Sequence, residues 1–381
     1  MNRKDAITNL LEHSDAKVKL LGKYLSIYLN VLSRSPIKKV YLFDLFCGEG
    51  KYSDNGNGSP IVILETIKNH FFFNNKTCID IDILFNDVGQ SEIEPDLLKI
   101  DRVKSFADKI FKPKNVNAHY TKIDFNELVK KVIKRTTQLK SNERALIFID
   151  PWGYKEINPT DIKSLIENKK SEVLLFLPIY FMSRFVEKSR DEEFKGGRAI
   201  RNFIATLFGD INELEKVKGQ RDFIIKIQEQ FKKFLNLKYV DTFKIERENN
   251  NLFCIFFFTN NKKGFEKMIQ AKWALDKKKG AEFKIGDEVT LNLFDEIEIS
   301  NYDQKVVDFI KKNNQVTNTE LTDFGYENNF LPTHTKKILD QIKEQLVIIS
   351  NDDKPARSFY LGDEKRSEER RVGKECRSRW S

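Results

Sequence analysis

Residues 40–50, VYLFDLFCGEG, decide the fold of this chain. The apolar run 40–43 is typical of a strand that is buried on both faces. Asp44 follows it, and a turn containing Gly48 and Gly50 comes next. Glycines let the backbone approach a ligand closely, and a carboxylate before the turn accepts hydrogen bonds from the ligand. The stretch therefore predicts a nucleotide-binding turn after the first strand of an α/β sheet, although only half of a GxGxxG pattern is present.

A second apolar run, residues 81–86, ends at Asp87. In doubly wound folds the acidic residue at the end of the second strand binds ribose hydroxyls. We expect this role for Asp87, and a turn formed by Asn86 and Asp87 is the alternative. Between the two strands, Ser59 is expected to cap a helix that has Pro60 at its first position.

A further strand, residues 145–149, runs into Asp150, Pro151, Trp152, Gly153 and Tyr154. A carboxylate, a neighbouring carbonyl and an aromatic ring suit methylation of an exocyclic amine, because the first two accept the amine hydrogens and the ring stacks on the base. Asp150 and Pro151 are therefore the candidate acceptors, and Trp152 or Tyr154 is the stacking ring. A plain strand-ending turn is the alternative.

These stretches resemble known motifs of class I methyltransferases. DLFCGEG resembles motif I, in which the turn passes under the methionine half of S-adenosylmethionine, and this implies a cofactor site at Asp44, Phe46, Gly48 and Gly50. DPWGY resembles motif IV of the amino-group enzymes without its second proline. By order, Asp124 corresponds to the acidic residue that meets the adenine amine, and it serves equally well as a helix N-cap.

Four segments in one order resemble the three-Cys-motif partner family, TcmP: HSDAKVKLLGKYLSIYL, YLFDLFCGEG followed by GSP, FIDPWGY, and FFFTNNKKGFEKM. The resemblance implies a Rossmann-type, methyltransferase-like domain in residues 1–275, encoded beside a radical-SAM-like partner protein, often on bacterial mobile elements. His13 falls in the first segment. His13, Lys17 and Lys19 are expected on the polar edge of a helix within residues 5–33.

The rest of the chain predicts a closing hairpin and a second domain. Residues 239–246 and 252–259 read as two strands joined by an Asn-rich turn, where a class I methyltransferase has its last two strands. Residues 276–302 are a linker or hairpin, and residues 303–362 have the pattern of a winged helix. Its third helix is expected to expose basic and polar side chains to nucleic acid, namely Thr333, His334, Lys336, Lys337 and Lys343. Protein docking is the alternative.

Residues 366–381 resemble a translated sequencing adaptor and are left out of the fold prediction. They carry six of the 66 basic and three of the 57 acidic residues, so the net charge falls from +9 to +6 without them. This mild positive charge permits a nucleic-acid partner. Cys47, Cys78 and Cys254 form no CxxC pair, which favours a reducing cytoplasm and excludes a zinc site. No run is long enough to span a membrane.

Two functions fit this sequence. The first is an α/β, Rossmann-like class I methyltransferase with helical insertions and a C-terminal winged helix, which uses S-adenosylmethionine and acts on nucleic acid or with its radical-SAM-like partner. The second is a non-catalytic adaptor that docks this partner. A cytosine C5 methyltransferase is disfavoured because no Pro-Cys pair is present. A nuclease is disfavoured because the carboxylates do not cluster at the spacing of metal ligands. An ATPase is disfavoured because the sequence contains no Walker A motif.

Overall fold

The computed structural model describes residues 12–70, 79–110, 112–151, 153–183, 198–209, 211–214, 217, 219–247, 251–276, 280–284, 301–349, 361 and 371–374. The chain divides into two compact units. Unit 1 consists of Met1–Ala271 and Glu282–Glu288, and unit 2 of Lys272–Ala281 and Val289–Ser381. The two units are described separately below.

Unit 1 is built on an eight-stranded sheet with the order β3-β2-β1-β4-β5-β7-β6-β8. Strands β1 to β5 are parallel, β7 is antiparallel to both β5 and β6, and β8 pairs in parallel with β6. The strands are β1 (Lys39–Asp44), β2 (Asp80–Asn86), β3 (Val116–Thr121), β4 (Glu143–Ile149), β5 (Ser171–Leu177), β6 (Tyr239–Arg247), β7 (Asn251–Thr259) and β8 (Glu282–Lys284). The predicted α/β sheet, with its parallel Rossmann-like strands and its closing antiparallel hairpin, is confirmed.

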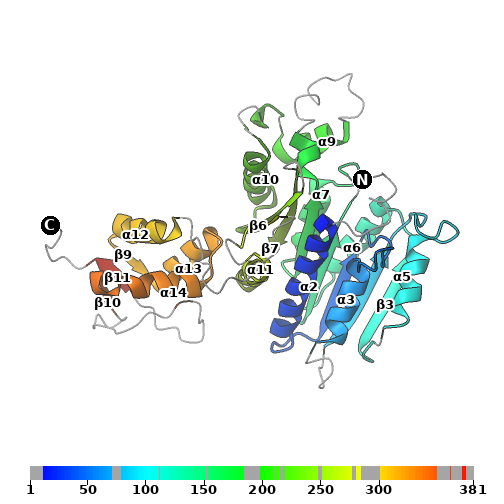
Figure 1. The fold of residues 1–381 in the computed structure, drawn as a ribbon, viewed down its shortest axis with the longest axis horizontal. Helices are drawn as coiled ribbons and strands as arrows, with labels where there is room; N and C mark the ends of the chain where they lie inside the picture. Colours follow the sequence, from blue (N-terminus) through cyan, green and yellow to red (C-terminus); the bar gives the residue numbers. More distant parts are fainter. Residues whose placement is uncertain are drawn as a thin grey trace. The chain divides into compact units, whose positions relative to one another are not determined.

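Helices cover both faces of this sheet (Figure 1). On one face, α6 (Phe125–Thr137), α7 (Pro159–Ile166), α9 (Arg198–Phe208) and α10 (Gly219–Leu235) share a core with alternate side chains of β1, β4, β5 and β7. On the other face, α2 (Glu12–Leu32) places the ring of Tyr24 edge-on to Phe257 of β7, with 5.0 Å between ring centroids. The remaining helices among the described residues up to Leu275 are α3 (Ser59–Lys68), α5 (Lys99–Ala107), α11 (Lys262–Leu275) and the 3-10 helix η2 (Ile211–Leu214).

The central strands are apolar because helices cover them on both sides. All seven residues of β5 are buried, as are five of the six residues of β1. Burial of a large apolar side chain contributes roughly 1.5–3 kcal/mol, so such strands hold the middle of the sheet firmly. In the described part of the chain, no helix is long and apolar enough to cross a membrane.

Unit 2 contains three helices and a three-stranded sheet within the described residues. The elements are α12 (Tyr302–Asn313), β9 (Gln315–Thr317), α13 (Asn318–Glu327), α14 (Pro332–Gln341), the 3-10 helix η4 (Lys343–Gln345), β10 (Leu346–Ile349) and β11 (Arg371–Lys374). The sheet order is β10-β11-β9, and both pairings are antiparallel. The core includes Val306, Leu321 and Leu339. Thr317 and Glu320 form a capping box that starts α13.

In unit 2 the structure adds one strand to the sequence prediction, leaves another untested and corrects the exposure of one residue. The second wing strand was expected at residues 358–361, of which only Leu361 is described, and Leu361 packs against the core of the unit. The strand β11, which the prediction did not include, comes from residues 371–374, inside the stretch that resembles an adaptor, and lies between β10 and β9. His334 is not exposed as predicted, because its ring packs on Trp273 with 4.2 Å between centroids and its Nδ1 accepts the Leu331 N–H.

Candidate functional site

The candidate site lies at the carboxyl ends of β1 and β4. The chain runs outward from β1 to β2 and β3 on one side and from β4 to β5 on the other, so the strand order reverses between β1 and β4. In open α/β sheets, ligands bind in the crevice at this reversal point. Asp44 ends β1, Asp87 directly follows β2 and Asp150 directly follows β4. The sheet therefore brings three predicted site carboxyl groups to one edge.

The glycine turn after β1 has the backbone geometry that the sequence predicts. Gly48 has φ +65° and Gly50 has φ +74°, a left-handed region in which side chains are strained. A Cβ on Gly50 would lie 2.9 Å from Cγ2 of Val103, and one on Gly58 would lie 2.9 Å from the Gly50 carbonyl oxygen. Gly50 and Gly58 therefore allow close packing of the loop, whereas a Cβ on Gly48 would meet only the Tyr52 hydroxyl, at 3.5 Å.

Asp44 is a buried carboxyl group with one oxygen left unpaired. Its Oδ2 accepts a hydrogen bond of 2.6 Å from the Ser59 hydroxyl, and its buried Oδ1 has no hydrogen-bond partner. Burial raises the pKa of Asp44 from 3.8 to about 7. The hydrogen bond from Ser59 lowers this pKa, and the negative charges of Asp150 and Asp87 raise it further. A buried acceptor without a partner is costly, so this oxygen fits a ligand that brings a donor.

The same contact corrects the prediction for Ser59. The helix α3 begins at Ser59 itself, with Gly58 as the N-cap residue and no side-chain cap. The Ser59 hydroxyl donates to Asp44 instead of accepting from a backbone amide. Pro60 does occupy the start of the helix, as predicted.

Asp87 holds the glycine turn in place. Its Oδ2 accepts the Gly48 N–H at 3.0 Å, and its Oδ1 accepts the Gly89 N–H at 2.7 Å. Each carboxylate oxygen can accept a second hydrogen bond, so both remain capable of binding hydroxyl groups. Asp87 therefore links the loops after β1 and β2, and this agrees with a role at the ligand as well as with the alternative role in a turn.

Asn86, which precedes Asp87, was not predicted as a site residue. It is buried, and its Nδ2 donates to the carbonyl of Ile123 at 3.0 Å while its Oδ1 accepts the Ile123 N–H at 2.9 Å. Its Oδ1 also accepts from the Thr121 hydroxyl. Asn86 therefore joins the ends of β2 and β3 and supports the loop next to Asp87. Only its position before the strand-ending acid could have signalled this role.

Asp150 forms an ion pair with Lys17, which corrects the prediction for this lysine. Lys17 was expected on the polar edge of its helix, but it is only 8% exposed and its Nζ contacts Asp150 Oδ2. The same Nζ lies 4.4 Å from the centroid of the Phe176 ring. The side chains of Glu12 and His13, at the start of α2, lie outside the part of the structure that is described, so the prediction for His13 is not tested. Lys17 thus brings α2 into the site and holds the Asp150 carboxylate.

The aromatic half of the predicted amine-binding motif is only partly described. Pro151 is buried, and Trp152 lies outside the described residues. Tyr154 was a candidate stacking ring, and this prediction is wrong: the residue is 4% exposed, its hydroxyl donates to the Pro178 carbonyl at 3.1 Å and its ring packs on Phe203. Tyr154 is a core residue because β4 and β5 leave its ring facing α9.

Asp124 and Phe46 lie in the loops after β3 and β1, and these loops meet at Phe125. Asp124 is exposed and acts as the N-cap of α6, accepting the Asn126 N–H at 2.9 Å. This is the capping role that the sequence left open. Phe46 stacks on Phe125, the residue after Asp124, with 4.8 Å between ring centroids. The two predicted cofactor contacts therefore belong to neighbouring segments.

A buried ion-pair network stabilises the far side of the glycine turn. Arg102 of α5 contacts Glu49 at 2.6 Å, and both side chains are less than 5% exposed. Glu49 also accepts from the Ser91 hydroxyl and the Glu92 N–H, and Arg102 pairs with Glu94 as well. Removal of one partner from such a pair leaves a buried charge, which typically costs about 3–5 kcal/mol. The network fixes the loop that carries Gly48.

Comparison with known proteins adds distant structural likenesses. No family model and no curated protein matches this sequence. A Legionella pneumophila protein of family DUF519 is 13% identical, with a TM-score of 0.39, covering 70% of this chain and 90% of its own. An O-methyltransferase from Bacillus cereus in complex with SAH is 10% identical, with a TM-score of 0.30 and coverages of 63% and 80%. A putative O-methyltransferase from Klebsiella pneumoniae has 10% identity, a TM-score of 0.30 and coverages of 68% and 91%. Likeness at this level transfers neither activity nor ligand.

Proposed function

We propose that the chain is a class I methyltransferase that binds S-adenosylmethionine at the carboxyl ends of β1 and β4. One observation carries the proposal: a glycine turn with positive φ at the reversal point of the sheet, beside a buried Asp44 oxygen that has no partner. The cofactor has an ammonium group to donate to such an oxygen and ribose hydroxyls to donate to Asp87. When bound, it supplies an electrophilic methyl group on a sulfonium.

The residues of the site would divide the work in the following way. Gly48 leaves the turn open for the methionine portion, and Asp87 both fixes that turn and accepts hydrogen bonds from the ribose. Phe46 would contribute an apolar surface beside the turn. Asp150, held by Lys17, would accept hydrogen bonds from an acceptor amine whose lone pair takes the methyl group. The proton released by this amine would pass to Asp150 or to water.

Calorimetric titration of S-adenosylmethionine into the full chain tests this proposal. We expect micromolar binding in the parent protein. Asp44→Asn removes a charge and one acceptor, so the affinity should fall about ten- to a hundredfold, the equivalent of a charge-assisted hydrogen bond. Asp222→Asn, on an exposed position of α10, is the matched control and should bind like the parent. No heat from a folded parent protein would refute the proposal.

A non-catalytic adaptor is the second candidate, and the surroundings of Asp150 favour it. Its carboxylate is already paired with Lys17, and Tyr154 is buried in the core and so takes no part in stacking on a base. Incubation with methyl-labelled S-adenosylmethionine separates the two functions. Transfer of label to an acceptor that is lost in Asp150→Asn supports the enzyme, whereas cofactor binding without transfer to any acceptor tested supports the adaptor.

We further propose that a radical-SAM-like three-Cys-motif protein is the partner. The support is the resemblance of four segments of this sequence to the TcmP family. Co-expression of the two proteins with an affinity tag on this chain is the direct test. A stable complex in size-exclusion chromatography is the expected result, and separate elution of the two folded proteins would contradict it.

For unit 2 we propose a winged helix that contacts the phosphates of nucleic acid. The order helix, strand, two helices and two strands supports the proposal, as do the exposed side chains of Lys336 and Lys337 on α14. We expect the double variant Lys336→Gln, Lys337→Gln to bind duplex DNA more weakly than the parent. The slope of the logarithm of the binding constant against the logarithm of the salt concentration should become shallower by about two, because two phosphate contacts are lost. The matched control is the Lys311→Gln, Lys312→Gln variant at the end of α12. Equal losses in both variants would indicate general charge attraction and contradict a specific role of α14.

A further inference from the structure

A pocket lies at the opposite edge of the sheet from the candidate methyltransferase site. It is lined by residues at the starts of β4 and β5 and at the end of β7, including Arg144, Glu172 and Thr259. The space inside it that is open to a bound group is about 50 Å³, enough for a small anion. Arg144 and Asp150 are six residues apart along one strand direction, so roughly 20 Å separates the two sites.

The pocket is strongly basic. Five of its lining residues are cationic and one is acidic; the cationic ones are Arg144, Lys169, Lys170, Lys263 and Lys267, and the acidic one is Glu172. Glu266 pairs with Lys263 and Lys267, at 3.0 and 2.8 Å. The Arg144 guanidinium instead donates through Nη1 to the carbonyls of Ser141 and Glu143. Arg144 therefore keeps its full charge without a carboxylate contact within the described residues.

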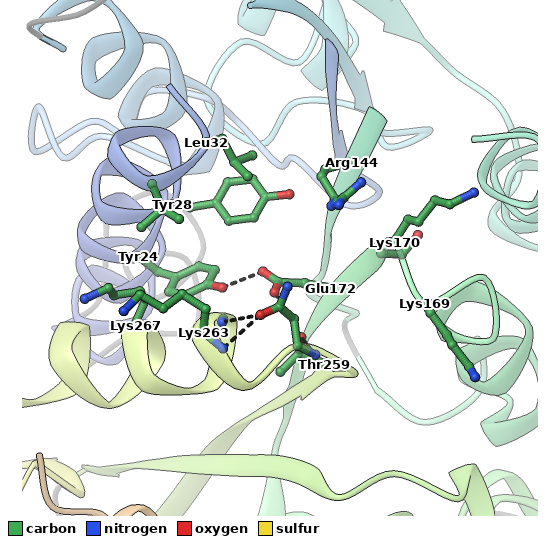
Figure 2. Close-up of a pocket in the computed structure, with 14 residues that line it drawn as sticks. Tyr24, Tyr28, Leu32, Arg144, Lys169, Lys170, Glu172, Thr259, Lys263 and Lys267 are labelled. Carbon is green, nitrogen blue, oxygen red and sulfur yellow. Dashed lines mark hydrogen bonds between the residues drawn. The ribbon is translucent and has the colours of Figure 1, made fainter. Parts of the chain in front are cut away.

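Tyr28 supplies an independent sign that a ligand belongs in this pocket. The residue is 6% exposed, and its hydroxyl is buried without a hydrogen-bond partner. In Figure 2 this hydroxyl points across the pocket toward Arg144. Burial and the nearby Glu172 raise the pKa of Tyr28 well above its ordinary value, so the hydroxyl keeps its proton and acts as a donor. A buried donor without an acceptor costs free energy that an anionic ligand would recover.

Glu172, the one acidic residue among those that line the pocket, accepts hydrogen bonds from two neighbouring hydroxyl groups. Glu172 Oε2 accepts from the Tyr24 hydroxyl, and Oε1 accepts from the Thr259 hydroxyl at 2.9 Å (Figure 2). Its pKa is raised to about 7 by burial, so at neutral pH the group carries only part of a negative charge. The repulsion that it exerts on an anion is correspondingly weak. Val31 and Leu32 of α2 add apolar side chains to the lining of the pocket.

We propose that this pocket binds the phosphate group of a small ligand, with Arg144 and the Tyr28 hydroxyl as its direct donors. Arg presents several N–H groups in a planar fork that matches phosphate oxygens. The lysines of α11 and of the β4–β5 connection raise the local anion concentration. Val31 and Leu32 offer apolar contact to the organic part of a phosphorylated molecule, and free phosphate shares the same recognition chemistry. The site is separate from the proposed cofactor site and does not depend on methyl transfer.

Calorimetric titration of the full chain with adenosine 5′-diphosphate and with inorganic phosphate tests the proposal. The titrations are made in the presence of saturating S-adenosylmethionine, so that the nucleotide does not enter the proposed cofactor site. Arg144→Gln and Tyr28→Phe each remove one donor, and each should weaken binding about tenfold or more. Lys131→Gln removes an exposed cation of α6 and is the charge-matched control. Circular dichroism confirms that every variant is folded.

The two probes distinguish the sources of the phosphate. Tighter binding of the nucleotide, lost in Arg144→Gln and Tyr28→Phe and kept in Lys131→Gln, supports a phosphorylated organic ligand. Equal binding of both probes with the same variant pattern supports the free anion. The proposal is overturned if neither probe binds at millimolar concentration, or if Lys131→Gln loses as much affinity as Arg144→Gln.

Discussion

Glu172→Gln is the substitution with the clearest consequence for stability. The Glu172 carboxyl group is buried at the start of β5, and burial raises its pKa from 4.5 to about 7 despite the hydrogen bonds from Tyr24 and Thr259. Because the folded pKa lies above the unfolded one, the folded state binds more protons between these two values. Stability from this group is therefore fully present below about pH 4.5 and is lost as the pH rises through about 7.

The size of this effect follows from the distance between the two pKa values. Each pH unit corresponds to about 1.4 kcal/mol, so ionisation of Glu172 costs the folded state about 3 kcal/mol at alkaline pH. Glutamine stays neutral, and its amide oxygen and NH2 group can both bond to hydroxyl groups. The variant therefore keeps the contacts and escapes the cost. Asp44, whose pKa is raised to about 7 as well, contributes equally to both proteins and cancels in the difference.

Urea unfolding of the parent and the variant at a series of pH values measures this difference. We expect the free energy of unfolding of Glu172→Gln, relative to the parent, to increase by about 2.5 kcal/mol between about pH 5 and about pH 8.5. Glu127→Gln, on exposed α6, should show no such trend. A difference that stays constant within about 0.5 kcal/mol would show that Glu172 is already ionised at pH 5 and would refute the reasoning.

Further predictions concern the Lys17 ion pair and the approach of α11 to β5. Lys17→Met leaves Asp150 without its cation, so the free energy of unfolding should fall by about 1–3 kcal/mol in urea, and the added change Asp150→Asn should restore part of it. Failure of the second change to recover any stability would contradict a direct pair. Gly264→Ala places a Cβ 2.0 Å from Glu172 Oε1 and should cost about 1–3 kcal/mol in thermal unfolding, more than the helix propensity it gains. Gly153→Ala, with nothing within 4 Å, is the control, and equal melting temperatures of the two variants would contradict the steric argument.

Several parts of the site could be predicted from sequence because they depend on local backbone requirements. A glycine turn after an apolar strand needs residues that tolerate positive φ, and Gly48 and Gly50 have this conformation. Strand-ending carboxyl groups follow from the same pattern, since parallel strands place their carboxyl ends at one edge. Asp44, Asp87 and Asp150 all lie at that edge. The winged helix, the partner and the methyl acceptor remain predictions.

Other parts could not be predicted because they depend on contacts between residues far apart in the sequence. Lys17 has the spacing of a surface lysine, and only the packing of α2 brings it to Asp150, 133 positions later. Tyr154 follows a motif that suggests a binding role, but the fold turns its ring into the core against Phe203. Ser59 has the sequence of a helix cap and donates instead to Asp44.

The sequence by itself determined the order of strands and helices and the glycine turn, because periodic apolar runs and glycine conformations are properties of short segments. The tertiary structure alone decided which charges meet. Burial gives Asp44 and Glu172 their raised pKa values, and the pocket around Arg144 and Tyr28 is formed by α2, α11 and the ends of three strands. Such features have no local signature, because the free energy of a buried charge depends on all the elements that surround it.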